Sequence, residues 1–476
     1  MTLIHAKNSF GHVLFYSISC LICISFIAIS GCNQTGTEGN PQAKIREEPT
    51  ASTSTADEPT PQPDSVHIDI PREDASKAGT QDIGRLKVIA ASIVDHMASQ
   101  FPDDPDALEA KARFYRMIGK LNVAKACWEH ALIQSPEYGY AYQGLGDIAS
   151  RNSDYVGAVN FLIKAVKFMP GDASATHELS DAFMKKGDLL EAIRVLELQI
   201  AIKPDSSDTL QLLGNARLAN REYALASEAF QKSLSLSPDN YMSQQGLGAA
   251  LVRLGKREEA KKWLSLQKLA RSVSNVSSNE AQTAERADIA ARLNYVARVY
   301  LKHGRLESAM EVLQFAAVNE PRDEDSRRLM VKLLQEKKKL NDAIAVAKEL
   351  TQIAPSNLGY RLTVGTLSQR QKDWATAQES FEHVVQAMPS RPEGYAALAE
   401  LFIVSGRNPD KALVLSKTVT ELRGSGSDFA NYSQTLVLNG KLLEAIAAMK
   451  VAVSKDPDNP DFSNLLDQLN KSQESR

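Results

Sequence analysis

Small and large apolar residues recur along most of this 476-residue chain with a period of 34. One column of the pattern is proline, at Pro102, Pro136, Pro170, Pro204 and Pro238, each 34 residues after the one before. A second column keeps the same period with alanine, at Ala90, Ala124, Ala158, Ala192, Ala226 and Ala260. Self-similarity at a fixed period of this length is the signature of a stacked repeat array. The pattern therefore predicts that one structural unit is repeated many times.

Each unit is expected to be a pair of antiparallel helices. The first helix has a large residue followed by a Leu-Gly or Leu-Ala pair, as in Tyr142, Leu145 and Gly146. A small residue in that pair lets two helices approach closely. A left-handed turn residue is commonly glycine, and the turn position holds Gly119, Gly187, Gly255, Gly304 and Gly440. The second helix is expected to begin at a bulky residue: Leu121, Tyr155, Leu189, Tyr223, Leu306, Trp374 or Leu442.

This pattern resembles the tetratricopeptide repeat (TPR) over residues 83–470. The resemblance implies an all-α, right-handed TPR solenoid of about ten helix-turn-helix repeats. A partial helix over residues 86–101 precedes the repeats, and a polar-faced helix over residues 460–469 is expected to cap them. The large apolar residues are interpreted as helix-packing core and not as a cofactor site.

One interruption divides the repeats into an N-terminal array over residues 83–270 and a C-terminal array over residues 289–470. The alanine period lengthens to 49 between Ala260 and Ala309, and the additional residues are mostly polar. Either the neighbouring helices are longer there or a polar loop separates two halves. The composition favours a loop with a helix from about Glu280, and a hinge and a rigid join both remain open for residues 271–288.

The N-terminus has the features of a targeting segment. Lys7 precedes a mostly apolar run over residues 13–29, as in a secretory signal peptide. The run ends in Ile29-Ser30-Gly31-Cys32, which resembles the lipobox of bacterial lipoproteins. That resemblance implies removal of residues 1–31 and lipidation of Cys32, with acyl chains such as palmitate. The alternative is a single membrane-spanning anchor, for which the run is short.

Residues 32–82 begin with the lipidated cysteine and continue as a tether rich in Pro, Thr and Ser. With few large apolar residues, such a stretch cannot offset the entropy lost on folding, so we expect it to be disordered. Asn33 follows the cysteine. By analogy with lipoprotein sorting, this residue favours a location at the outer membrane, facing the periplasm or the cell surface.

Charge and candidate chemistry narrow the function. The net charge of −3 gives no basic excess of the kind that nucleic-acid binding requires. No phosphate-binding loop, metal-spaced His/Cys set or nucleophile motif is present, so we predict neither enzymatic activity nor a cofactor or metal. Cys127 is interpreted as a buried apolar residue.

The groove of the solenoid is the expected binding surface, because the first helix of each unit lines it. Counting along the pattern predicts these partner-binding residues: Arg113, Gln143, Asp147, His177, Asp181, Gln211, Asn215, Asn294, Arg298, Arg328 and Lys332. The amides of the first half suit an extended peptide, and Arg298, Arg328 and Lys332 suit an acidic one. The Lys, Asn and Arg set that clamps a C-terminal carboxylate in chaperone-binding TPR proteins is absent.

The sequence thus predicts a membrane-anchored protein-protein interaction scaffold of the bacterial cell envelope, which binds proteins or peptide segments in its groove. Two alternatives remain. One is a regulator or activator of a cell-wall or export enzyme. The other is a glycan-binding module, which the scarcity of aromatic residues in the groove disfavours.

Overall fold

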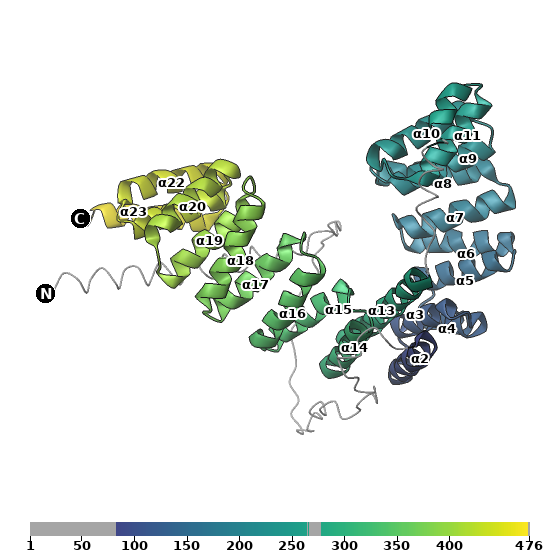
Figure 1. Cartoon of the computed structure of the whole chain (residues 1–476), viewed down its shortest axis with the longest axis horizontal. Coiled ribbons are helices and arrows are strands. Elements are labelled where there is room, and N and C mark those ends of the chain that lie inside the picture. The colour runs from purple at the N-terminus through teal and green to yellow at the C-terminus, as the bar shows by residue number, and fades with distance from the viewer. Residues whose placement is uncertain (1–81, 264, 266–277, 475–476) are drawn as a thin grey trace, which may run out of the picture. The chain divides into compact units, whose positions relative to one another are not determined.

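The computed structural model describes residues 82–263, 265 and 278–474, and these residues form helices and short turns without a strand (Figure 1). The predicted signal peptide, Cys32, nearly all of the tether and residues 271–277 of the insertion lie outside the described residues. The helices fall into two compact units, one spanning Asp64–Pro355 and the other including Ser356–Arg476.

The unit that ends at Pro355 begins with a lone helix, α2, and continues in helix pairs. Its helices are α2 (Ile83–Gln100), α3 (Pro105–Met117), α4 (Leu121–Gln134), α5 (Gly139–Arg151), α6 (Tyr155–Phe168), α7 (Ala173–Lys186), α8 (Leu189–Ile202), α9 (Ser207–Ala219), α10 (Tyr223–Leu236), α11 (Tyr241–Arg253), α13 (Ser278–Lys302), α14 (Leu306–Asn319), α15 (Glu324–Glu336) and α16 (Leu340–Ile353).

The unit that begins at Ser356 continues the same pattern. Its helices are α17 (Leu358–Arg370), α18 (Trp374–Ala387), α19 (Pro392–Ser405), α20 (Pro409–Leu422), α21 (Gly426–Leu438), α22 (Leu442–Lys455) and α23 (Pro460–Glu474). As predicted, α23 closes the series: Phe462, Leu465 and Leu469 are buried against α22 and its neighbours. The remaining faces of α23 are polar, which suits the last helix of an array.

The repeat pattern predicted the ends of the helices well. The second helix of seven pairs begins at the bulky residue expected for it, for example at Leu121 in α4 and at Trp374 in α18. Several first helices begin after a polar N-cap residue, because its side chain can accept a bond from an otherwise unpaired backbone N–H. Asp172 accepts in this way from Ala175, and Ser206 accepts from Thr209.

The turn inside each repeat contains one residue with positive φ, which recurs every 34 residues in each run of repeats. Glycine adopts this conformation without strain because it has no Cβ, and the five predicted glycines are all left-handed, as is Gly406. The other four repeats force an L side chain into the left-handed region: Ser153, Arg221, Lys338 and Lys372.

Small residues in the first helices bring the paired helices close together. A Cβ atom on Gly214 would lie 2.6 Å from Cε1 of Phe230, and one on Gly365 would lie 2.3 Å from Cε1 of Phe381. Both phenylalanines are buried and come from the second helix of the same pair. The glycines are therefore required by packing, as the sequence pattern predicted.

The described part of the insertion is a lengthened helix that packs against the start of the chain. α13 has 25 residues and contacts α2 and α3 (Figure 1). At its end the ring of His303 stacks on Phe101 with centroids 4.0 Å apart. Nζ of Lys302 lies 3.0 Å from a carboxylate oxygen of Asp104 and 2.5 Å from one of Asp106. Two series of repeats therefore begin beside the same helices, α2 and α3.

Candidate protein-binding surface

The first helices of successive repeats contact one another along each unit. α3 packs on α5, α5 on α7, α7 on α9 and α9 on α11, and the same holds for α13 with α15 and for α17 with α19. No two second helices make contacts of this extent in the described part of the chain. Neighbouring units of a curved stack lie closer on its inner side, so the first helices line the inner face, as the TPR resemblance implied.

On α3, α5 and α7 the polar groups of this face are bonded to one another. The amide of Gln143, which is 9% exposed, donates to Oγ of Ser174 at 3.0 Å and to Oε1 of Glu178 at 2.8 Å. The carboxylate of Asp147 accepts from Arg116 and from Arg151, each at 2.9 Å. These bonds join successive first helices and leave few polar atoms unpaired.

The other predicted residues of the first half are similarly engaged, with two exceptions. Arg113 pairs with the buried carboxylate of Glu109, and its guanidinium lies 5.4 Å from the centre of the Tyr140 ring. Nε2 of His177 lies 2.8 Å from Oγ1 of Thr209, and burial lowers the pKa of this histidine. A further pair joins Asp181 to Lys185 at 2.7 Å. The two exceptions, Gln211 and Asn215, are half-buried on α9.

The predicted residues of α13 and α15 differ in exposure. Asn294 is only 4% exposed; it donates to Asp323 at 2.9 Å and accepts from Ser326 at 2.5 Å. Arg298 and Lys332 are exposed. Arg328 is exposed too and pairs with Asp325 at 3.1 Å. Since α13 and α15 are in contact, three exposed cations come from two touching helices.

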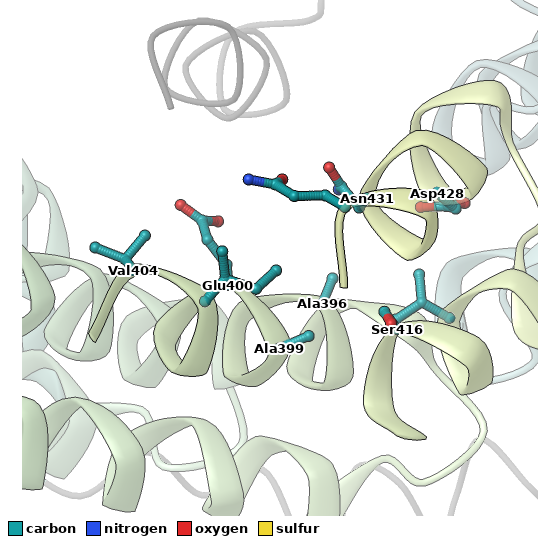
Figure 2. Close-up of a pocket in the computed structure, with 10 residues that line it drawn as sticks. Ala396, Ala399, Glu400, Val404, Ser416, Asp428 and Asn431 are labelled. Atoms are coloured by element: carbon teal, nitrogen blue, oxygen red, sulfur yellow. The ribbon is translucent and has the colours of Figure 1, made fainter. Parts of the chain in front are cut away.

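A pocket that the sequence analysis did not predict lies between α19 and α21 (Figure 2). Its apolar wall includes Ala396, Ile403 and Val419, and its polar rim is formed by Glu400, Asn431 and Gln434. The pocket is small, since the centre of a water molecule can move through about 30 Å³ of it. Figure 2 shows the carboxyl group of Glu400 and the side chain of Asn431 directed toward its open side.

The carboxyl group of Glu400 is poorly solvated. Burial raises its pKa, and only a 3.5 Å hydrogen bond from the amide of Gln369 opposes this shift. No ion pair to Glu400 occurs in the described part of the chain. The carboxyl group therefore lacks the cation that a buried carboxylate ordinarily requires.

The amides on the rim are also without partners. Gln434 is 8% exposed, and among the described residues its side chain makes no hydrogen bond. The same is true of Asn431, which is half-buried. Buried polar groups are nearly always hydrogen-bonded, so an exception at the wall of a pocket calls for an explanation.

The other carboxylate of this pocket is fully satisfied. Asp428 is 1% exposed and accepts from Arg423 at 2.9 and 2.5 Å and from the backbone N–H of Ser425 at 2.9 Å. Burial alone would raise the pKa of Asp428, but the bonds from Arg423 and Ser425 outweigh burial and lower it. Ser416 is likewise paired, with its Oγ 2.7 Å from Oγ1 of Thr435. Asp428 and Ser416 hold the helices in place.

The sequence contained a signal for this pocket. Glu400 follows Lys332 by two periods of 34 residues, and thus occupies the same column as Arg298 and Lys332. Asn431 occupies the column of Asn294 and Arg328 once the single-residue insertion near Asn408 is counted. The column count had been ended one repeat too early.

Two further observations concern chemistry and membranes. In the part of the chain that the structure describes, no three His, Cys, Asp or Glu side chains are grouped so that they could hold a metal ion. Within the same ranges, no helix has the length and apolar character needed to cross a membrane. Cys127 is a free, buried thiol whose pKa is raised by burial, as expected for an apolar packing residue.

The geometry defines an α-helical repeat protein whose first helices present a polar inner face. Residues 212–266 match the family described as Tetratricopeptide repeat. With the helix pairs and the 34-residue period, this match shows that the chain is a tetratricopeptide-repeat protein.

Known proteins with similar sequences include a eukaryotic receptor and a bacterial operon protein. The peroxisomal targeting signal receptor of Komagataella phaffii is 29% identical over 147 residues, which are 30% of this chain and 25% of the receptor. Cellulose synthase operon protein C of Xanthomonas axonopodis pv. citri is 22% identical over 409 residues, 79% of this chain and 26% of that protein. The chain spans about a quarter of the length of the curated relatives that it matches first.

Among solved structures, the chain is similar to YrrB, described as a TPR protein with an unusual peptide-binding site. The match has a TM-score of 0.33 and 15% sequence identity, and it covers 38% of this chain and 93% of that one.

Proposed function

We propose that this protein is a protein-interaction scaffold of a bacterial cell envelope, which a lipid on Cys32 holds at a membrane. Partner proteins bind along the inner face of the first helices. The proposal rests chiefly on one observation: polar groups of this face between α19 and α21 are buried and have no partner within the described chain. A groove with such groups suits a partner that supplies the missing hydrogen bonds.

The envelope location is supported by sequence features. A basic residue, an apolar run and the lipobox-like Ile29-Ser30-Gly31-Cys32 follow in the order of a lipoprotein signal. A protein with two or more acyl chains is stably anchored, whereas a single chain gives only reversible binding. The proline-rich tether would hold the repeats away from the membrane surface.

A second candidate function is the regulation of an export or cell-wall enzyme. It is favoured by the similarity of 79% of this chain to a cellulose synthase operon protein. Both candidates require a protein partner, and they differ in whether that partner changes its catalytic rate on binding. The rate of the recovered partner, measured with and without this protein, would separate them.

Crosslinking in intact cells followed by mass spectrometry tests the scaffold proposal. We expect reproducible crosslinks between partner proteins and lysines near the first helices. Recovery of the protein's own crosslinks alone would overturn the proposal. The anchor has a separate test in the Cys32→Ser variant, which we expect to leave the membrane fraction; unchanged fractionation would contradict lipidation.

The exposed cations of α13 and α15 allow a test of which part of the groove is used. If an acidic partner binds there, changing Arg298, Arg328 and Lys332 together to Glu should weaken its binding at least tenfold at low salt, because attraction becomes repulsion. The same three residues changed to Gln serve as the control for lost contacts. Binding unaffected by the Glu variant would place the partner elsewhere.

A further inference from the structure

We infer that the pocket between α19 and α21 binds a basic side chain, lysine or arginine, from a partner protein. This inference rests on the proposed function and adds to it the chemical class of one recognised residue. The carboxyl group of Glu400 marks the pocket as a site for a cation. Its apolar wall suits the aliphatic part of the same side chain.

The first argument is the electrostatic state of Glu400. A carboxylate withdrawn from water requires an opposite charge or several hydrogen bonds. Here the only bond is the one from Gln369, at 3.5 Å, which is beyond the usual length for N–H···O. An incoming ammonium or guanidinium group would supply both the charge and the donors that the carboxyl group lacks.

The second argument is the pair of amides beside it. Gln434 is 8% exposed and lines the pocket, but its amide is not bonded to any described residue. Asn431 lies next to it in the same rim, also unbonded in the described chain. Amides offer acceptors to a cation and both kinds of group to a peptide backbone. Their position suits an extended segment whose basic side chain enters the pocket.

The third argument is the shape and composition of the pocket. Ile403 and Val419 contribute apolar wall, and the space is narrow. Lysine and arginine bury an aliphatic stem along apolar surface while the charged end reaches a polar group. An acidic side chain would place two carboxyl groups together, which is unfavourable in a poorly solvated site. The pocket therefore discriminates by charge and by shape.

A second cleft in the other unit lacks these features. It lies beside α14, α15 and α16 and is larger, about 330 Å³, but Lys337 and Glu307 form an ion pair across its lining. A charge that already has its partner gives no reason to expect another. The contrast leaves the α19–α21 pocket as the site with unmet hydrogen-bonding needs.

The test uses the full chain and three fluorescein-labelled pentapeptides, Gly-Ala-Lys-Ala-Gly and the same peptide with norleucine or glutamate in place of lysine. Norleucine retains the aliphatic stem and lacks the charge. We expect the lysine peptide to bind about tenfold more tightly than the norleucine peptide, the effect of one charge-assisted hydrogen bond. The glutamate peptide should bind more weakly than either.

Two variants assign the preference to this pocket. Glu400→Gln keeps the shape of the side chain and should abolish the tenfold preference for lysine while leaving norleucine binding unchanged. Glu379→Gln, an exposed glutamate on α18, makes the same charge change outside the pocket and should have no effect. Ala396→Leu fills the pocket with Glu400 intact and should weaken lysine binding as well. Thermal unfolding of each variant verifies that it folds.

Equal binding of the lysine and norleucine peptides, or a preference that survives in Glu400→Gln, would overturn the inference. Partner crosslinks on other first helices would in that case leave the scaffold function intact. If instead the crosslinking recovers no partner, the scaffold function fails, whatever the peptides show. The two failures are therefore distinguishable.

Discussion

The first-helix faces of α5 and of α19 hold polar residues at the same repeat positions, but in opposite states of satisfaction. On α5, Gln143 and Asp147 are bonded to side chains of the neighbouring first helices. On α19 and α21, Glu400 and Gln434 lie in a pocket with almost no partners. A polar residue on the inner face of a repeat array is thus not by itself a binding residue. The bonds that it lacks are the more informative property.

The largest expected effect concerns a satisfied residue. Asn294→Leu removes a buried amide and leaves Asp323 and Ser326 without its bonds. Each buried group left unpaired costs about 1–3 kcal/mol, so we expect a loss of roughly 2–4 kcal/mol in the free energy of unfolding. Urea unfolding followed by circular dichroism measures it. Gln434→Leu is the matched control, and an equal loss there would break the comparison.

The next effect separates the two carboxylates of the pocket region by pH. The pKa of Asp428 is lowered by Arg423 and Ser425, which outweigh its burial. Its contribution to stability is complete above the usual pKa of 3.8 and is lost as the pH falls through the lower folded-state value. Asp428→Asn should therefore be less stable than wild type by about 1–3 kcal/mol at pH 7. The gap should narrow below pH 3.8.

Glu400 should behave in the opposite way, because burial raises its pKa. Below the usual value of 4.5 the group is protonated in both folded and unfolded chains. Stability is lost as the pH rises from there through the folded-state value. Glu400→Gln should accordingly be more stable than wild type at pH 7 and equal to it at acid pH. Unfolding temperatures measured between pH 4 and 7 would contradict this if wild type were the more stable throughout.

The smallest effect tests the exposed edge of the satisfied face. Arg151 pairs with Asp147, but its side chain is 55% exposed. Surface pairs of this kind contribute about 0–1 kcal/mol, so Arg151→Ala should change the free energy of unfolding by less than about 0.5 kcal/mol. A change of several times that size in urea unfolding would show that the network on α5 is cooperative and not a set of separate pairs.

Most of the fold was predictable because its determinants are local. The 34-residue columns located the starts of α4 and α18, the left-handed Gly187 and the close approach at Gly214. Each of these depends on residues within one repeat or its neighbour. The four non-glycine residues at the turn, such as Lys372, could not be inferred from the rule that favours glycine there. The surrounding repeat imposes the strained conformation.

The site was less predictable because satisfaction depends on the facing helix. Gln143 and Gln434 are both amides of first helices, yet only Gln143 meets Ser174 and Glu178 on the next one. The column count placed these residues on one face without stating which of them had partners. The contact of α13 with α2 was beyond reach for a different reason, since a periodic pattern identifies only neighbouring repeats as partners.

That contact has a consequence for how the protein folds. A solenoid ordinarily assembles from nearest neighbours, so its folding can begin at any repeat and spread in both directions. Lys302 and Asp104 meet across 198 residues, however, and bringing them together closes a very long loop. Since folding rates fall as contacts become less local, the docking of α13 on α2 and α3 should be a late step. The helices on either side of it would form first, as two independent segments.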